Sequence, residues 1–216
     1  MYPISNKIMT YRALIPVKSL STAKGRLAEY LTLYQRETLV LDMLHHVIQI
    51  LLESELFESI SVVSPDTRVL ELVQAWGARP LLEEQFGHNP SLHAAALKEK
   101  ASALLTISAD LPSLCTCDVR RLIEQSRQHH VVLAPSHEGT GTNAILVRPP
   151  LAVPYLFGPN SLQSYQQAAR QRQLSSALVH SPGLASDIDT IEDLRELHHL
   201  NCKLQEESEF ATCHYR

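Results

Sequence analysis

The stretch Ala103-Leu-Leu-Thr-Ile-Ser-Ala-Asp-Leu-Pro112 joins an apolar run to a carboxylate placed directly after it. The pattern predicts a buried strand over residues 103–107, ended by Asp110 and the proline at position 112. A predicted helix over 118–128 follows. Ligands of open α/β sheets bind at the carboxyl ends of the strands. The stretch therefore predicts an α/β fold with Asp110 at the active edge of the sheet.

The sequence on both sides repeats the alternation of strand and helix. Further strands are predicted at 11–17, 59–63, 79–82, 131–134, 143–147 and 177–180, and further helices at 32–51, 66–76, 90–100, 162–172 and 190–199. Thr32 and Gln35 have the spacing of a capping box at the start of the long helix. Strands that alternate with helices favour a mostly parallel sheet with helices on both faces.

Length and charge limit the class of protein. The 216 residues fit one domain over 1–200 with a tail over 201–216. The net charge of -4 argues against a general nucleic-acid-binding protein and a basic membrane-surface protein. No run reaches the roughly 18 apolar residues of a membrane span, and residues 1–10 lack the apolar stretch of a signal peptide. We therefore expect a soluble, cytoplasmic protein without nucleic-acid or membrane partners.

Several common sites are not favoured. In a reducing compartment the four cysteines are expected to be free thiols, and the Cys115-Thr-Cys117 spacing is not that of a zinc site. The run from Gly139 to Ala144 matches G-x-G-x-x-A, but it opens a predicted strand rather than a helix, which disfavours a dinucleotide site. The sequence also has no Walker loop and no G-x-S-x-G nucleophile motif.

Asp187 and Asp189 form a second acidic cluster. In an extended segment, residues two apart project to the same side, roughly 6–7 Å apart. Two like charges this close, with Asp110 opposite, favour a bound cation, and ligands that are all oxygen suit Mg²⁺. The alternative is that Asp189 or Thr190 only caps the last helix.

Lys18, Lys24 and Arg26 follow the first predicted strand. Three cations before any acid, in a loop at the edge of the sheet, are suited to binding phosphates, and the alternative is a solvated loop. Such a site would suit the transfer of a group to a phosphate. A phosphate acceptor needs no protein nucleophile, because its second pKa is about 6 and it is already largely deprotonated at neutral pH.

Taken together, the motifs resemble one known family, and they occur in the family's order over residues 11–197. The matching stretches are Ile15-Pro-Val-Lys18-Ser-Leu20, Ala23-Lys24-Gly-Arg26-Leu27, Val63-Ser-Pro-Asp66, Ser108-Ala-Asp110-Leu-Pro112, Glu138-Gly-Thr-Gly-Thr142-Asn143-Ala, Phe157-Gly158-Pro-Asn-Ser161 and Asp187-Ile-Asp189-Thr190-Ile-Glu192-Asp193-Leu194. They resemble the 2-phospho-L-lactate (or phosphoenolpyruvate) guanylyltransferases of coenzyme F-420 biosynthesis.

The resemblance implies a Rossmann-like three-layer α/β/α nucleotidyltransferase fold, similar to that of molybdenum-cofactor guanylyltransferases. It implies transfer of GMP from GTP to a phosphorylated three-carbon acid (2-phospho-L-lactate, phosphoenolpyruvate or 3-phosphoglycerate), with Mg²⁺ as cofactor, in a monomer or homodimer. The alternatives are a nucleotidyltransferase with another phosphorylated acceptor, such as a pterin or sugar, and a non-catalytic nucleotide-binding protein on the same fold.

The resemblance also assigns residues by their place in the motifs. Asp110, Asp187 and Asp189 are the expected metal ligands; Thr142, Gly158 and Ser161 the acceptor contacts; Lys18, Lys24 and Arg26 the contacts to nucleotide phosphates; and Asp110 and Lys24 the catalytic residues. The chain departs from the family at Gly25, where serine is common, at His88, where leucine is frequent, and at Tyr165, near a frequent histidine.

Overall fold

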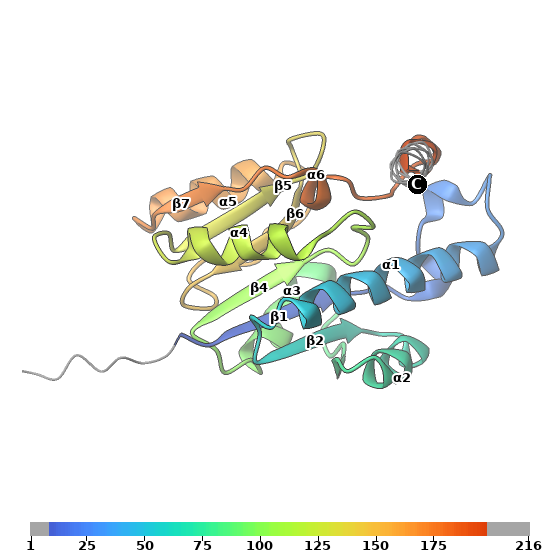
Figure 1. Ribbon diagram of the computed structural model, residues 1–216, viewed down its shortest axis with the longest axis horizontal. Helices are drawn as coiled ribbons and strands as arrows, with labels where there is room; N and C mark the ends of the chain where they lie inside the picture. The colour runs from blue at the N-terminus through green and yellow to red at the C-terminus, as the bar shows by residue number, and fades with distance from the viewer. Residues whose placement is uncertain (1–8, 198–216) are drawn as a thin grey trace, which may run out of the picture.

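A computed structural model describes residues 9–197 and places them on a single seven-stranded sheet (Figure 1). The strand order is β3-β2-β1-β4-β6-β5-β7. The predicted tail over 201–216 and the last two residues of the helix predicted over 190–199 lie outside the described residues. The division into one domain and a tail therefore stays a prediction.

The strands lie close to the predicted positions. They are β1 Tyr11–Pro16, β2 Ser59–Ser64, β3 Arg79–Leu82, β4 Ala103–Ile107, β5 Val131–Pro135, β6 Thr142–Val147 and β7 Ser176–Leu178. The helices are α1 Leu33–Glu53, α2 Thr67–Ala75, α3 His88–Leu97, α4 Thr116–Ser126, α5 Ser161–Gln171 and the short α6 Pro182–Ala185, and residues 191–197 are also helical. The α6 turn was not predicted.

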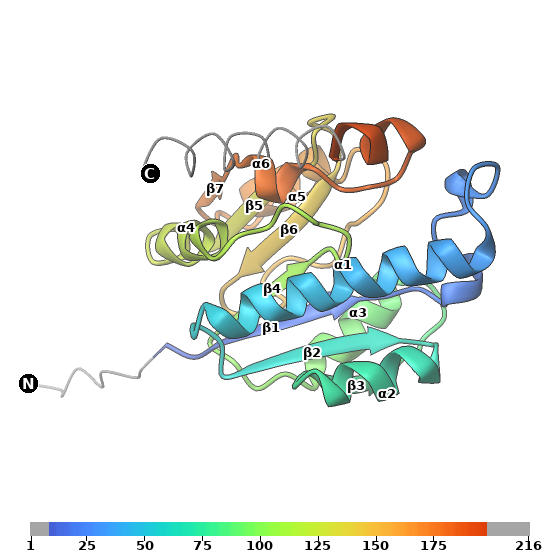
Figure 2. The same ribbon diagram turned by 45° about the vertical axis from the view of Figure 1, so that its right-hand side comes forward.

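The sheet is mostly parallel, as predicted, but β6 is an exception. It pairs antiparallel with both β4 and β5, while the other pairs of strands are parallel. The physical reason is the link between β5 and β6, which is too short for the helical crossover that parallel strands require and folds back as a hairpin. The start of β6, rather than its end, therefore lies beside the end of β4 (Figure 2).

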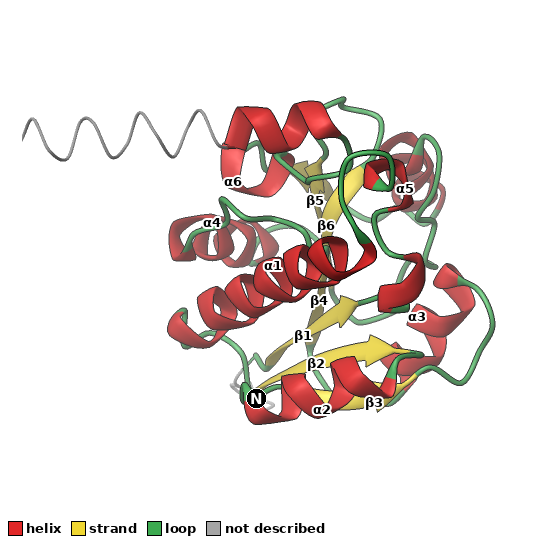
Figure 3. Cartoon of the chain, turned by 90° about the vertical axis from the view of Figure 1, so that its right-hand side faces the viewer, coloured by secondary structure: helices red, strands yellow, loops and turns green. Residues whose placement is uncertain are grey.

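Helices cover both faces of the sheet, which confirms the three-layer α/β/α arrangement (Figure 3). Buried side chains of α1, α2, α4 and α6 form one apolar cluster on one face. Those of α3 and α5 form two clusters on the other face. Alternation along β1 fits both layers, because Ala13 and Ile15 belong to the first cluster and Leu14 to the cluster of α3.

Local signals fixed several helix starts. Thr32 and Gln35 form the predicted capping box of α1, in which Thr32 Oγ1 accepts from the Gln35 amide at 3.3 Å and Gln35 Oε1 accepts from the Thr32 amide at 2.9 Å. Asp66 caps α2 by accepting from the Arg68 amide at 3.1 Å. These bonds satisfy amides that a helix start would otherwise leave unpaired.

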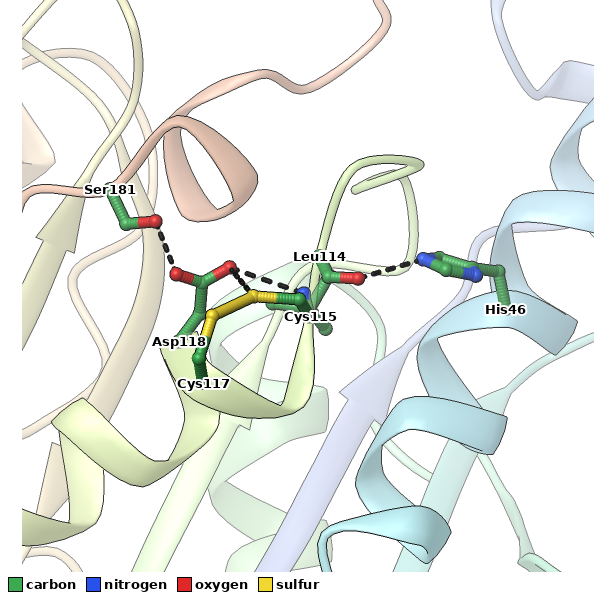
Figure 4. Close-up of a disulfide and its surroundings, with 6 residues drawn as sticks. All are labelled: His46, Leu114, Cys115, Cys117, Asp118 and Ser181. Atoms are coloured by element: carbon green, nitrogen blue, oxygen red, sulfur yellow. Dashed lines mark hydrogen bonds between the residues drawn. A yellow bond between two sulfur atoms is a disulfide. The ribbon is translucent and has the colours of Figure 1, made fainter. Parts of the chain in front are cut away.

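The expectation of free thiols is wrong at one pair, because Cys115 and Cys117 form a disulfide (Figure 4). The fold brings the two sulfurs together where Cys115 ends a loop and Cys117 lies in the first turn of α4. The buried Asp118 carboxylate beside them accepts from the Cys115 amide at 3.1 Å and from the Ser181 hydroxyl. This carboxylate therefore ties the start of α4 to the segment that begins α6.

Within the described residues, no helix combines the length and apolar character needed to cross a membrane.

Candidate active site

The predicted active edge of the sheet carries a cavity of about 450 Å³. It lies where β1 and β4 end and where β6 begins, because the reversal of β6 places Asn143 beside Ser108, whose amide donates to the Asn143 carbonyl at 2.8 Å. The lining residues that carry polar or aromatic side chains are Lys18, Lys24, His88, Ser108, Asp110, Asn143, Phe157, Asp187 and Asp189.

The three predicted metal ligands all line this cavity. Asp110 is positioned by Ser108, whose hydroxyl donates to its Oδ1 at 2.7 Å. The late acidic segment is joined to the strand end by the amide of Ile188, which donates to the Asp110 carbonyl at 3.3 Å. Residues far apart along the chain are thereby held around one space, as the sequence predicted.

Asn143 holds Asp187 in place, a role that the sequence analysis did not assign. Its side-chain amide donates to Asp187 Oδ1 at 2.9 Å and to the carbonyls of Leu184 and Ala185 at 3.1 and 3.2 Å. Asn143 is itself buried in β6. The strand therefore fixes both the α6 turn and the carboxylate that follows it.

The charges around Asp187 favour a cation. Burial is the main influence that raises the pKa of Asp187, the charges of Asp110 and Asp189 raise it further, and the hydrogen bond from Asn143 opposes the rise. Several carboxylates that face one cavity suit Mg²⁺ in both charge and ligand chemistry. The donor set thus fits the expected cofactor, although Asp110, Asp187 and Asp189 do not form a cluster with ligand atoms within 4.8 Å of one another among the described residues.

Lys24 lies between two of these acids. Its ammonium pairs with Asp110 Oδ2 and, at 3.0 Å, with Asp189 Oδ1, and its side chain is only 8% exposed. Burial is the largest influence and would lower the pKa of Lys24, but the charges of Asp110 and Asp189 and the hydrogen bonds to them outweigh it and raise the pKa. The side chain therefore stays cationic within the acidic cluster.

The other two predicted phosphate-binding residues differ in exposure. Lys18 lines the cavity. Arg26 does not belong to the lining, since its side chain is 75% exposed and approaches Asp189 only to 3.7 Å. The loop that carries them contains two 3₁₀ turns, Leu20–Thr22 and Gly25–Leu27, which were not predicted.

The last acidic segment also caps the final helix, which was the alternative interpretation, but the capping side chains are those of Thr190 and Asp193 and not that of Asp189. Thr190 caps the helix, because its hydroxyl accepts from the Asp193 amide at 3.3 Å, and Asp193 accepts from the amides of Asp189 and Thr190 at 2.9 and 2.7 Å. This reciprocal cap leaves the Asp189 side chain free to face Lys24.

The three predicted acceptor contacts lie near one another, but only Gly158 lines the cavity. Thr142 and Ser161 are buried beside it and share a hydrogen bond of 3.2 Å between their hydroxyls. The Ser161 amide donates to the Gly158 carbonyl at 3.1 Å. Their roles toward an acceptor stay predictions.

An aromatic wall that was not predicted borders the same space. His88 packs edge-on against Phe157 with ring centroids 5.4 Å apart, and both line the cavity. Asn89 fixes the Phe157 backbone by two bonds, one in each direction, of 2.9 and 3.0 Å. Tyr165 is fully buried and accepts from the Leu156 amide at 3.0 Å, so this departure from the family supports the wall from outside the cavity.

His88 makes stability depend on pH. His88 is exposed as a residue, but partial loss of water around its ring, with a smaller contribution from the charge of Lys18, lowers its pKa. The unfolded chain then takes up a proton near pH 6.5 that the folded chain resists, so this contribution to the free energy of unfolding is present above about pH 6.5 and lost as the pH falls.

We expect the free energy of unfolding to fall more in the wild type than in His88→Gln between about pH 7.5 and about pH 5.5, either side of the usual histidine pKa. Urea unfolding of both proteins at the two pH values measures this difference. Equal losses would show that His88 does not resist protonation.

Comparison with solved structures identifies the class of the fold. A nucleotidyl transferase from Methanothermobacter matches with a TM-score of 0.64 at 14% identity, over 89% of this chain and 99% of that protein. The chain thus has a nucleotidyltransferase fold, and the Rossmann-like expectation is confirmed.

Sequence comparison then gives the family. The family model described as "Guanylyl transferase CofC like" matches residues 11–208, so the chain belongs to this guanylyl transferase family. A phosphoenolpyruvate guanylyltransferase from Sphaerobacter thermophilus is 40% identical over 88% of this chain and 93% of its own length. A 3-phospho-D-glycerate guanylyltransferase from Colwellia psychrerythraea is 30% identical, over 92% and 96%. The predicted guanylyltransferase class is confirmed.

Proposed function

We propose that this guanylyltransferase transfers GMP from GTP to phosphoenolpyruvate with release of pyrophosphate, as a step of coenzyme F-420 biosynthesis. The observation that carries the proposal is the single cavity lined by Asp110, Asp187, Asp189, Lys18 and Lys24. Three acids and two cations around one space suit a reaction between two polyanions. The names of the relatives favour phosphoenolpyruvate over the other three-carbon acids.

In the proposed reaction, an oxygen of the acceptor phosphate forms a bond to the α-phosphorus of GTP. The bond from that phosphorus to the bridging oxygen breaks, and its electron pair leaves with pyrophosphate. The acceptor oxygen is already deprotonated at neutral pH, so the protein contributes position and charge rather than a base.

The acidic and basic residues of the cavity have different proposed roles. Asp110, Asp187 and Asp189 would hold Mg²⁺, which supplies a Lewis acid that neutralises charge on the phosphates. Lys18 and Lys24, with Arg26 at the rim, would offset the negative charge that develops on pyrophosphate. Gly158, Thr142 and Ser161 would orient the acceptor through a backbone amide and hydroxyls.

The test incubates the purified protein with GTP, Mg²⁺ and one acceptor at a time. We expect pyrophosphate release with phosphoenolpyruvate to exceed that with 2-phospho-L-lactate and 3-phosphoglycerate, and a product mass equal to GMP joined to the acceptor with loss of water. A second series replaces GTP with ATP, CTP and UTP and tests the preference for guanine.

Other outcomes would contradict the proposal. Pyrophosphate release only with a phosphorylated pterin or sugar would assign another acceptor. GTP binding without pyrophosphate release for any acceptor would indicate the non-catalytic nucleotide-binding alternative. We also propose that the enzyme acts in the cytoplasm, where GTP is supplied. The protein is expected to be a monomer or a homodimer, and sedimentation analysis would distinguish the two.

A further inference from the structure

Lys24 sits where a divalent cation is proposed to bind. Its ammonium contacts Asp110 and Asp189, two of the three proposed metal ligands, and its side chain is almost fully buried between them. The backbone of Lys24 has a left-handed conformation with φ of 50° and begins the 3₁₀ turn Gly25–Leu27. The positive charge of Lys24 thus offsets the negative charges of two carboxylates that would otherwise be available to a metal ion.

We propose that Lys24 is a built-in counter-ion that keeps divalent metal from binding tightly until a nucleotide triphosphate draws the ammonium away from Asp110 and Asp189. The inference rests on the proposed metal site and adds an order of binding, in which the metal binds tightly only together with the nucleotide.

The physical argument is competition for the same oxygens. The ammonium and the metal both require Asp110 and Asp189, and two cations cannot share these oxygens without strong repulsion. Lys24 is held in place by its contacts with both of these acids. It can leave if another anion replaces the carboxylates, and the flexible four-carbon stem allows the ammonium to reach phosphate oxygens.

Arg26 provides a matched control. It also carries a positive charge close to Asp189, but at 3.7 Å and with a side chain that is 75% exposed. Its pairing is therefore screened by water and contributes little. Removal of Arg26 changes the net charge by the same amount as removal of Lys24 without emptying the position between the acids.

The experiment measures binding of Mn²⁺ as the probe metal, by electron paramagnetic resonance of the free ion, in the absence of nucleotide. We expect Lys24→Met to bind Mn²⁺ about tenfold more tightly than the wild type, and Arg26→Met to change the affinity by less than about threefold. Lys24→Arg, which keeps the positive charge, is expected to bind Mn²⁺ as weakly as the wild type.

The second arm adds a GTP analogue with a non-hydrolysable α,β-methylene bridge. The analogue is expected to tighten Mn²⁺ binding by a larger factor in the wild type than in Lys24→Met, because only the wild type has an ammonium to displace. Circular dichroism and thermal unfolding of each variant establish that the comparison is made between folded proteins.

The outcomes separate this inference from the proposed function. If Lys24→Met binds Mn²⁺ no more tightly than the wild type while Asp110→Asn lowers binding with the analogue present, the metal site stands and the counter-ion role is wrong. If no protein binds Mn²⁺ even with the analogue present, the proposed metal site is itself wrong, and the inference is overturned with it.

Discussion

Replacement of Asp110 by asparagine is expected to lower the rate of GMP transfer by about a hundredfold or more, the scale seen when one charge-stabilising group is removed from an active site. The asparagine side chain would keep nearly the same shape and could still accept from the Ser108 hydroxyl. It would lack the negative charge that Lys24 and the proposed metal both require. The measurement is pyrophosphate release at saturating GTP and acceptor.

The matched control for this variant is Asp42→Asn, which removes the same charge from an exposed position on α1. Its rate is expected to remain close to that of the wild type. If Asp110→Asn keeps most of the activity, the strand-end carboxylate does not take part in the reaction. Thermal unfolding of both variants shows whether a lost rate reflects lost folding instead.

Replacement of Gly183 by alanine is expected to lower the free energy of unfolding by about 3 kcal/mol, near the upper end for overpacking in a filled interior. A Cβ atom at this position would lie 2.2 Å from Asp118 Oδ2 and 2.6 Å from the Ser113 carbonyl oxygen. Neither atom can move easily, because one belongs to the backbone and the other belongs to a carboxylate whose two oxygens accept from the Cys115 amide and the Ser181 hydroxyl. Urea unfolding measures the loss.

Gly25→Ala is the control for the alanine substitution, because a Cβ at Gly25 meets no atom within 4 Å. Its free energy of unfolding is expected to stay within about 0.5 kcal/mol of the wild type. A similarly small effect of Gly183→Ala would mean that the contact between α6 and the start of α4 is looser than the structure indicates.

The sequence predicted those parts of the molecule that depend on neighbouring residues. The apolar run over 103–107 matches β4 residue for residue, and the Thr32 capping box has the expected bonds, since both follow from local pattern and side-chain chemistry. Asp110 lies at the predicted edge because it follows the carboxyl end of a strand, and the carboxyl ends of parallel strands meet at one edge of the sheet. The presence of Asp187 and Asp189 in the same cavity was also predicted, from their spacing of two residues and from the resemblance of the motifs.

What could not be predicted depends on contacts between distant segments. Asn143 lies within a recognisable motif, yet its bonds to Asp187 and the α6 carbonyls exist only because β6 reverses beside β4. Gly183 carried no local signal, because its requirement arises from Ser113 and Asp118, which lie far earlier in the chain. The Cys115–Cys117 disulfide likewise could not be read from a spacing that resembles no common pattern.

The reversed strand also affects which parts of the cavity can vary. Asn143 lies within β6, and its carbonyl accepts from the Ser108 amide just beyond the end of β4, so the carboxylate of Asp187 is supported by the sheet rather than by a loop. Insertions or deletions in the 136–141 hairpin would leave this support in place. The position of the Asp187 carboxylate therefore does not depend on the length of this hairpin.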